Sequence, residues 1–302
     1  MLRIFKKNKD QCSAAVAMTN PELIRHALFG GATLLTAALI WWPLWALFDS
    51  DLKRDYHTLI PFIPIITLYL LYLKRRDLSA KMTYSPGMGI VGIAAGLALY
   101  ALAWAGGRNL NVNDQATLRI LSALVFLWGA FLLIYGPGAF KAVLFPLLFL
   151  LFMVPLPFQF MEQVITFLQR GSTEFANLLF FLSQVPYYRD GFSFHLTGIS
   201  VCVAPECSGI RSGLALFITA WLAGYLFLNS PWRRIMLVLM VFPITMFKNG
   251  IRISTLTLLG TYVDPRILES SLHREGGIPF FGLALLMLAA VLYFLRKGDG
   301  SR

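Results

Sequence analysis

Residues 118–154 read LRILSALVFLWGAFLLIYGPGAFKAVLFPLLFLLFMV, and this stretch decides the class of fold. Its charged residues are Arg119 and Lys141, and Gly-Pro-Gly at 136–138 divides it into two apolar blocks, 118–135 and 139–154. Each block approaches the roughly 20 residues that a perpendicular helix needs to cross a bilayer. The stretch therefore predicts two neighbouring membrane-spanning helices.

Comparable apolar blocks run through the rest of the chain. Of its 302 residues, 57% are hydrophobic and 14% are charged, and the mean hydropathy is +0.67, which excludes an ordinary soluble globular protein. We predict an all-α polytopic membrane protein with about eight transmembrane helices. The expected spans are residues 27–48, 58–73, 88–105, 118–135, 139–154, 210–228, 235–259 and 279–295.

The distribution of charge predicts the orientation in the membrane. Lys and Arg number 26 against 15 Asp and Glu, a formal net charge of +11. With eight spans and a cytoplasmic N-terminus, the basic clusters fall inside, and the long outer segment 155–208 has only Arg170 and Arg189 as basic residues. We therefore expect both termini in the cytoplasm and no nucleic-acid partner. The expected organisation is a basic tail at 1–26, one transmembrane domain at 27–296 and a short tail at 297–302.

Two regions of the long outer segment differ from plain spans. Residues 158–183 mix glutamines, glutamates and Arg170 with aromatic residues and leucines. This pattern favours an amphipathic interfacial helix, and the alternative is a polar helix packed in a bundle. Residues 186–203 alternate apolar and polar side chains around two glycines, which predicts a short outer β-hairpin before the sixth span.

Three residues of complementary chemistry are expected at one depth, on the outer side. Cys207 precedes the sixth span, Arg252 lies in the outer third of the seventh with Lys248 on the same helical face, and His273 follows in the next loop. A thiolate, a proton carrier and a cation that stabilises an oxyanion form a set suited to acyl transfer. Cys207 also stands at the start of a helix, where the free N–H groups, the helix dipole and Arg211 favour a thiolate.

Each of these residues has an alternative interpretation. Cys207 could pair with Cys202 in a structural disulfide, and Arg252 could snorkel to the interface or neutralise Glu275 or Asp264. His273 could be an ordinary loop histidine.

The choice of base and nucleophile also stays open on the residues alone. His195, in the expected hairpin, competes with His273 as the base, and Ser208 or Ser212 is an alternative nucleophile. No cysteine has zinc-type spacing to histidines, and we expect neither a metal nor a cofactor.

Four local patterns together resemble the exosortase/archaeosortase family of membrane-embedded cysteine transpeptidases. They are YHTLIP at 56–61 continuing to LLYLKRR at 70–76; FPLLFLLFMVPLP at 145–157; VAPECSGI at 203–210; and NGIRI at 249–253, followed by His273 and Gly277.

The resemblance implies a role for each matching residue. Cys207 would be the nucleophile, Arg252 would stabilise the oxyanion or position the substrate, and His273 would be the general acid and base. Expected supporting residues are Ser208, Gly209, Arg211 and Asn249.

With a histidine at position 273 the chain resembles the bacterial exosortase branch, and this resemblance implies a bacterial inner membrane with the active site facing the periplasm. The implied partners are membrane lipid and exported proteins whose C-terminal signal combines a Pro-Glu-Pro-like motif, a transmembrane helix and a basic tail. The acceptor of the acyl-enzyme is unknown. The competing functions are a membrane transporter or exopolysaccharide-export component without peptidase activity, and a structural scaffold.

Overall fold

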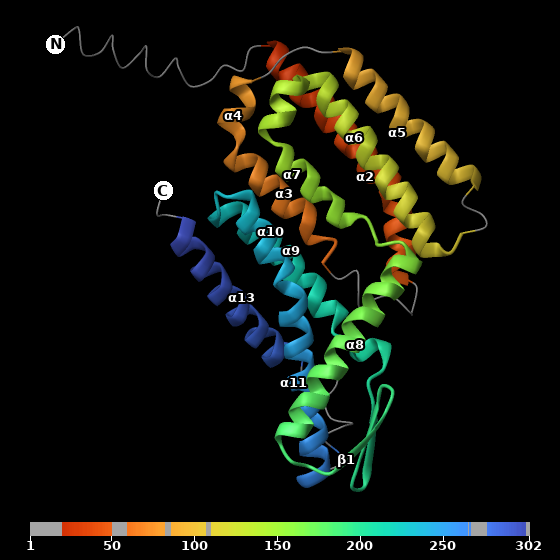
Figure 1. Ribbon diagram of the computed structural model, residues 1–302. Helices are drawn as coiled ribbons and strands as arrows, with labels where there is room; N and C mark the ends of the chain where they lie inside the picture. The colour runs from red at the N-terminus through yellow and green to blue at the C-terminus, as the bar shows by residue number, and fades with distance from the viewer. Residues whose placement is uncertain are drawn as a thin grey trace, which may run out of the picture. The chain divides into compact units, whose positions relative to one another are not determined.

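The computed structural model describes residues 20–49, 59–81, 86–106, 110–264, 266 and 277–299 (Figure 1). The chain divides into two compact units, Met1–Pro157 and Phe158–Arg302. The first contains α2 (Asn20–Asp49), α3 (Phe62–Leu73), α4 (Arg75–Ala80), α5 (Pro86–Gly106), α6 (Val112–Ala142), α7 (Leu144–Phe149) and the 3₁₀ helix η2 (Leu150–Met153). The second contains α8 (Phe158–Leu182), β1 (Tyr187–Asp190), β2 (Ser193–Leu196), β3 (Ile199–Cys202), η3 (Pro205–Ser208), α9 (Ile210–Phe227), α10 (Pro231–Leu239), α11 (Val241–Tyr262) and α13 (Gly277–Asp299).

Helix α6 is the central element of the first unit and contacts α2, α4, α5 and α7. Its N-terminus is capped by Asn111, whose side chain accepts a hydrogen bond of 2.8 Å from the backbone N–H of Asp114. Near its C-terminus Gly136 is non-helical (φ 80°) and Pro137 has no N–H to donate, so the helix kinks where the apolar block is interrupted in the sequence.

Glycines allow α5 and α6 to pack with their backbones close together. A β carbon at Gly129 of α6 would overlap the backbone of Gly92 and Ile93 in α5, and one at Gly96 would overlap the backbone of Phe126. Small residues at such positions allow the close van der Waals contact that holds membrane helices together. The α5–α6 pair therefore depends on these glycines for its spacing.

Helices α8 and α11 form the core of the second unit. A β carbon at Gly171 of α8 would overlap the Met246 side chain, and one at Gly250 of α11 would overlap the Phe175 side chain, so the two helices lie close along their length. On another side of α11, helices α9, α10 and α13 enclose an apolar core that includes Leu216, Leu237 and Leu288.

The three strands form an antiparallel sheet in the order β1-β2-β3. Its turns contain Gly191 and Gly198, whose φ angles of 54° and 85° favour glycine. Phe194 and Leu196 of β2 are buried in an apolar cluster with Phe180 of α8. The predicted hairpin region is thus a three-stranded meander, one strand longer than a hairpin, and it is seated on α8.

The helices confirm an α-helical polytopic membrane protein. In the described part of the chain, six helices are long and apolar enough to span a membrane: α2, α5, α6, α9 preceded by η3, α10 with α11, and α13. A bent pair, Leu144–Met153 with Phe158–Leu182, would make seven, and α3 is shorter, so the predicted count of eight is not confirmed. Pro155 and Pro157 interrupt the helical run between η2 and α8.

Helix α8 packs on protein along one face, as the alternative interpretation of residues 158–183 expects. Its polar residues Gln169, Ser172 and Thr173 are buried on the side that packs against α11 and η3, and its exposed face includes Phe160 and Phe167. Amphipathicity in the sequence shows that one face is covered, and here the cover is protein. This packing agrees with the alternative, a polar helix packed in a bundle, and because Glu162, Arg170 and Glu174 are also exposed, a membrane-surface position of the other face stays a prediction.

We predict that Gly129→Val separates α5 from α6 and destabilises the protein by about 2–3 kcal/mol, because the new side chain meets backbone that cannot rotate away. Thermal unfolding of the purified protein in detergent measures the effect. Gly87→Val is the matched control in α5, since nothing lies within 4 Å of a β carbon there. Equal unfolding temperatures for the two variants would contradict the proposed packing.

Candidate active site

Cys207 lies in η3, a single 3₁₀ turn between the end of the sheet and the start of α9. Its backbone N–H donates to the Ala204 carbonyl at 2.8 Å, and its own carbonyl accepts a hydrogen bond of 2.5 Å from Nδ2 of Asn249 in α11. The half-buried Cys207 side chain packs against an apolar cluster that includes Val203 and Ile253. The turn is therefore held from the side of α11.

Gly209 makes the change from η3 to α9 possible. It has φ 80° and ψ 13°, the left-handed conformation that disfavours other residues, and it is the N-cap of α9. A β carbon there would also lie 3.2 Å from Cγ of Asn249. Cys207 consequently stands just ahead of the N-terminus of α9, where the first-turn N–H groups and the helix dipole favour negative charge.

Arg252 lies one helical turn beyond Asn249 on α11, and residues three apart in a helix share a face. Ile253, the next residue, packs in the same cluster as Cys207. The half-buried Arg252 is thus on the part of α11 that faces η3. Arg211, in the first turn of α9, is exposed.

His273 and Glu275 lie outside the described residues, as do Tyr56, His57 and Thr58 of the first motif. Helix α11 ends at Tyr262 and α13 begins at Gly277, so His273 belongs to the connection between them. The structure therefore brings Cys207, Ser208, Gly209 and Asn249 together, and the position of His273 stays a prediction.

His195, the alternative base, faces away from Cys207. Strand residues alternate between the two faces of a sheet, and Phe194 and Leu196 point into the apolar cluster against which Cys207 packs. His195 is exposed on the opposite face, where its Nδ1 lies 2.8 Å from Oγ of Ser200 and its ring stacks on Tyr188. This geometry separates His195 from the candidate nucleophile.

The alternative nucleophiles and the disulfide receive no support from the geometry. Cys202 and Cys207 are both free thiols, Cys202 being exposed at the end of β3. Ser208 is fully buried, and its Oγ has no hydrogen-bond partner in the described part of the chain. Ser212 donates its hydroxyl hydrogen to the Gly209 carbonyl at 3.0 Å, so that proton is not directed toward a base.

Sequence analysis identified Lys248 as an intramembrane cation but missed what it contacts. Its Nζ donates to Oγ of Ser212 at 2.6 Å, and its side chain is only 2% exposed. Gln169 of α8 was also missed, and its amide donates to the Val203 carbonyl at 2.5 Å, just ahead of η3. Each contact joins segments distant in sequence, and the only available signal was a polar residue in an otherwise apolar face.

An ion pair joins the sheet to α8. Arg189 of β1 donates two hydrogen bonds to Glu174, at 2.7 and 3.0 Å. This bidentate pairing raises the pKa of the Arg189 guanidinium above its ordinary value, so the residue stays charged. Together with Gln169, the pair anchors both ends of the segment that leads to Cys207.

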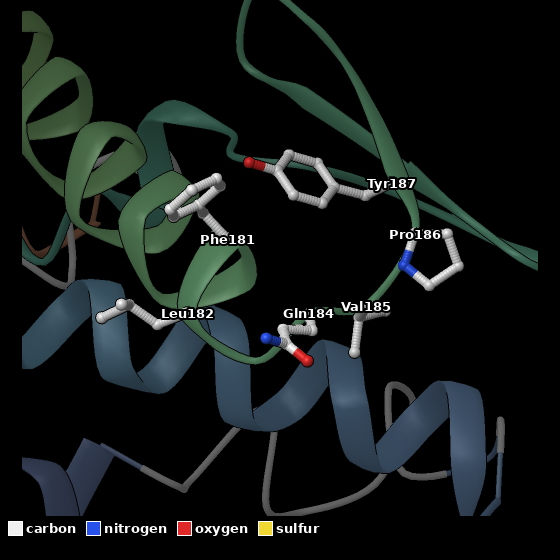
Figure 2. A pocket seen from close by; sticks show the side chains of 6 residues that line it. All are labelled: Phe181, Leu182, Gln184, Val185, Pro186 and Tyr187. Atoms are coloured by element: carbon white, nitrogen blue, oxygen red, sulfur yellow. The ribbon is translucent and has the colours of Figure 1, made fainter.

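A separate apolar pocket of about 440 Å³ lies where α8 ends. Figure 2 shows Phe181 and Leu182 on the helix and the segment Gln184, Val185, Pro186 and Tyr187 curving past them. None of the candidate catalytic residues lines this pocket. Among the described residues, histidine, cysteine and carboxylate side chains form no group of three or more that could hold a metal ion.

The apolar helices define the class as a multi-pass α-helical membrane protein. The sequence model of one family, the transmembrane exosortases, matches residues 41–290, and the chain belongs to this family. This confirms the resemblance carried by the four motifs. A search of curated proteins and a search of solved structures each found no match.

We predict that Asn249→Asp alters the accessibility of Cys207, because a carboxylate of the same size cannot donate to the Cys207 carbonyl. The rate of Cys207 alkylation, measured with Cys12 and Cys202 replaced by serine, should change by up to about tenfold, the equivalent of one neutral hydrogen bond. Thr257→Val, a buried substitution farther along α11, is the control and should leave the rate unchanged. An unchanged rate in Asn249→Asp would show that the hydrogen bond does not hold the turn.

Proposed function

We propose that this exosortase is a cysteine-type peptidase and transpeptidase that cleaves the C-terminal sorting signal of exported proteins. The family implies protein substrates with sorting signals. The observation that carries the proposal is the placement of a free, half-buried Cys207 ahead of the N-terminus of α9, fixed by Asn249 and faced by the turn of α11 that holds Arg252.

In the proposed reaction, the Cys207 thiolate attacks the carbonyl carbon of the scissile peptide and forms a carbon–sulfur bond. The carbonyl electrons move to the oxygen, and Arg252 together with N–H groups at the start of α9 stabilises the oxyanion. The carbon–nitrogen bond then breaks, and His273 protonates the departing amine of the signal. The product is a thioester between Cys207 and the exported protein.

The second half of the reaction releases the exported protein. An acceptor amine or hydroxyl attacks the thioester, His273 accepts its proton, and the carbon–sulfur bond breaks to restore the thiolate. The assignment of His273 to both proton transfers is supported by the opposite orientation of His195 on the sheet.

For the cellular setting, we propose a bacterial inner membrane with both termini in the cytoplasm and the site facing the periplasm. A substrate helix with its basic tail inside would then present its cleavage motif on the outer side. The partners in this proposal are exported proteins with a Pro-Glu-Pro-like motif, a transmembrane helix and a basic tail, together with membrane lipid, and the reaction uses no cofactor.

The decisive experiment co-expresses a substrate bearing such a signal with the wild type, Cys207→Ala or Cys202→Ala. Gel mobility reports the loss of the signal. Cys207→Ala should lower processing by about 10³-fold or more, because the covalent step is lost. Cys202→Ala removes the neighbouring free thiol and should process normally. Normal processing by Cys207→Ala would refute the peptidase assignment and leave a transporter or a structural scaffold as the remaining interpretations.

A second prediction separates the two candidate bases. His273→Ala should lower processing by about 10²–10⁴-fold, the usual contribution of a positioned acid–base group. His195→Ala should retain activity within about threefold, because His195 lies on the far face of the sheet. The same processing assay measures both, and the reverse pattern would assign the base role to His195.

A further inference from the structure

Lys248 is a buried cation with an unusual hydrogen-bond partner. Its side chain is 2% exposed, and its Nζ donates to Oγ of Ser212 at 2.6 Å. Ser212 in turn donates to the Gly209 carbonyl at 3.0 Å. Two hydrogen bonds therefore connect α11 to the backbone two residues beyond Cys207.

The burial of this ammonium has a large energetic cost. A charged lysine in an apolar interior is strongly destabilising unless it is paired, and no carboxylate in the described part of the chain forms an ion pair with Lys248. A methionine would fill similar space without that cost. A polar lysine that contacts the turn at the start of α9 is therefore poorly explained as packing alone.

Lys248 and Asn249 are consecutive residues of α11 that act on the same short turn. Asn249 binds the Cys207 carbonyl directly, and Lys248 binds the Gly209 carbonyl through Ser212. In a trans peptide, the N–H points opposite to the carbonyl of the same peptide plane, and the peptides of the described residues are all trans. The Asn249 contact therefore fixes the direction of the Ser208 N–H group. The Ser212 contact adds to the first backbone hydrogen bond of α9, from the Gly213 N–H to the Gly209 carbonyl at 2.8 Å, in restraining the direction of the Ile210 N–H group.

We propose that Lys248, acting through Ser212, is a positioning residue that fixes the orientation of the Cys207–Gly209 turn for the reaction of Cys207. This inference rests on the proposed function, in which Cys207 is the nucleophile. Lys248 touches neither the thiol nor the reacting peptide in this role. Its effect passes through the serine hydroxyl to the Gly209 carbonyl.

A double-mutant cycle tests the proposal in the full-length protein in detergent. The variants are Lys248→Met, Ser212→Ala and the double substitution, each with Cys12 and Cys202 replaced by serine so that Cys207 is the sole thiol. N-ethylmaleimide measures the alkylation rate of Cys207, and titration of a purified substrate separates kcat from KM.

If Lys248 and Ser212 act as one connection, each single substitution should change the alkylation rate by about tenfold and lower kcat more than it raises KM. The double variant should differ little from the more affected single variant, because removing either group already breaks the connection. Ser212→Thr keeps the hydroxyl and should restore the rate to within about threefold of the wild type. Multiplicative effects, no effect, or failure of Ser212→Thr to restore the rate would overturn the proposal.

Three controls separate positioning from general damage. Lys297→Met removes an exposed cation from the last turn of α13, and Thr257→Val alters a buried polar residue of α11; neither should change the alkylation rate. A protein with Cys202 as its sole thiol reports the fold, and Lys248→Met should leave Cys202 alkylation unchanged. If Lys248→Met changes the rate of Cys202 alkylation, the proposal is tested by comparing Ser212→Ala with Ser212→Thr, because both of these variants keep Lys248.

Failure of this inference is distinguishable from failure of the proposed function. If Cys207→Ala abolishes processing but the cycle shows no coupling, only the role of Lys248 is refuted. If Cys207→Ala still processes substrate, the peptidase function is refuted whatever the alkylation rates show.

Discussion

The hydrogen bond from Asn249 to the Cys207 carbonyl joins the two parts of the second unit on which the site depends. One part is the chain that leaves the sheet, turns through η3 and enters α9, and the other is the long helix α11. Within the turn, the Cys207 N–H donates to the Ala204 carbonyl. The geometry is also set from outside, by Asn249 at the Cys207 carbonyl and by Gln169 at the preceding Val203 carbonyl. The close packing of α8 on α11 brings both amides to the turn.

The sequence predicted the long apolar helices well, because a continuous hydrophobic run of bilayer length has few alternative structures. It predicted the fifth span poorly, because residues 139–154 are shared among the end of α6, the short α7 and η2, and Pro137 interrupts the run. It was ambiguous for α8, whose amphipathic pattern shows that one face is covered but not whether lipid or another helix covers it. Whether lipid or protein covers a helix face depends on contacts between segments that are distant in the sequence.

The same limit applies to the candidate site. Motif spacing selected Cys207, Asn249 and Arg252 as candidates, of which the structure joins Cys207 and Asn249 by a hydrogen bond, while the role of Arg252 stays a prediction. Motif spacing was not enough to reject His195, because the face on which a strand residue lies depends on the register of the sheet. The contact from Lys248 to Ser212 was equally inaccessible, since it depends on how α11 is rotated against α9.

The exposed apolar face of α13 determines how the protein behaves after it is extracted from the membrane. Ala284 and Leu288 pack into the core with α9, α10 and α11, whereas Ile278, Leu286, Tyr293 and Phe294 are exposed. In a bilayer, acyl chains can cover this apolar face at no cost in hydration. After extraction, surfactant molecules must coat it along the whole helix. The particle that elutes from a sizing column is consequently heavier than the 33.9 kDa of the polypeptide, and its apparent mass includes that coat.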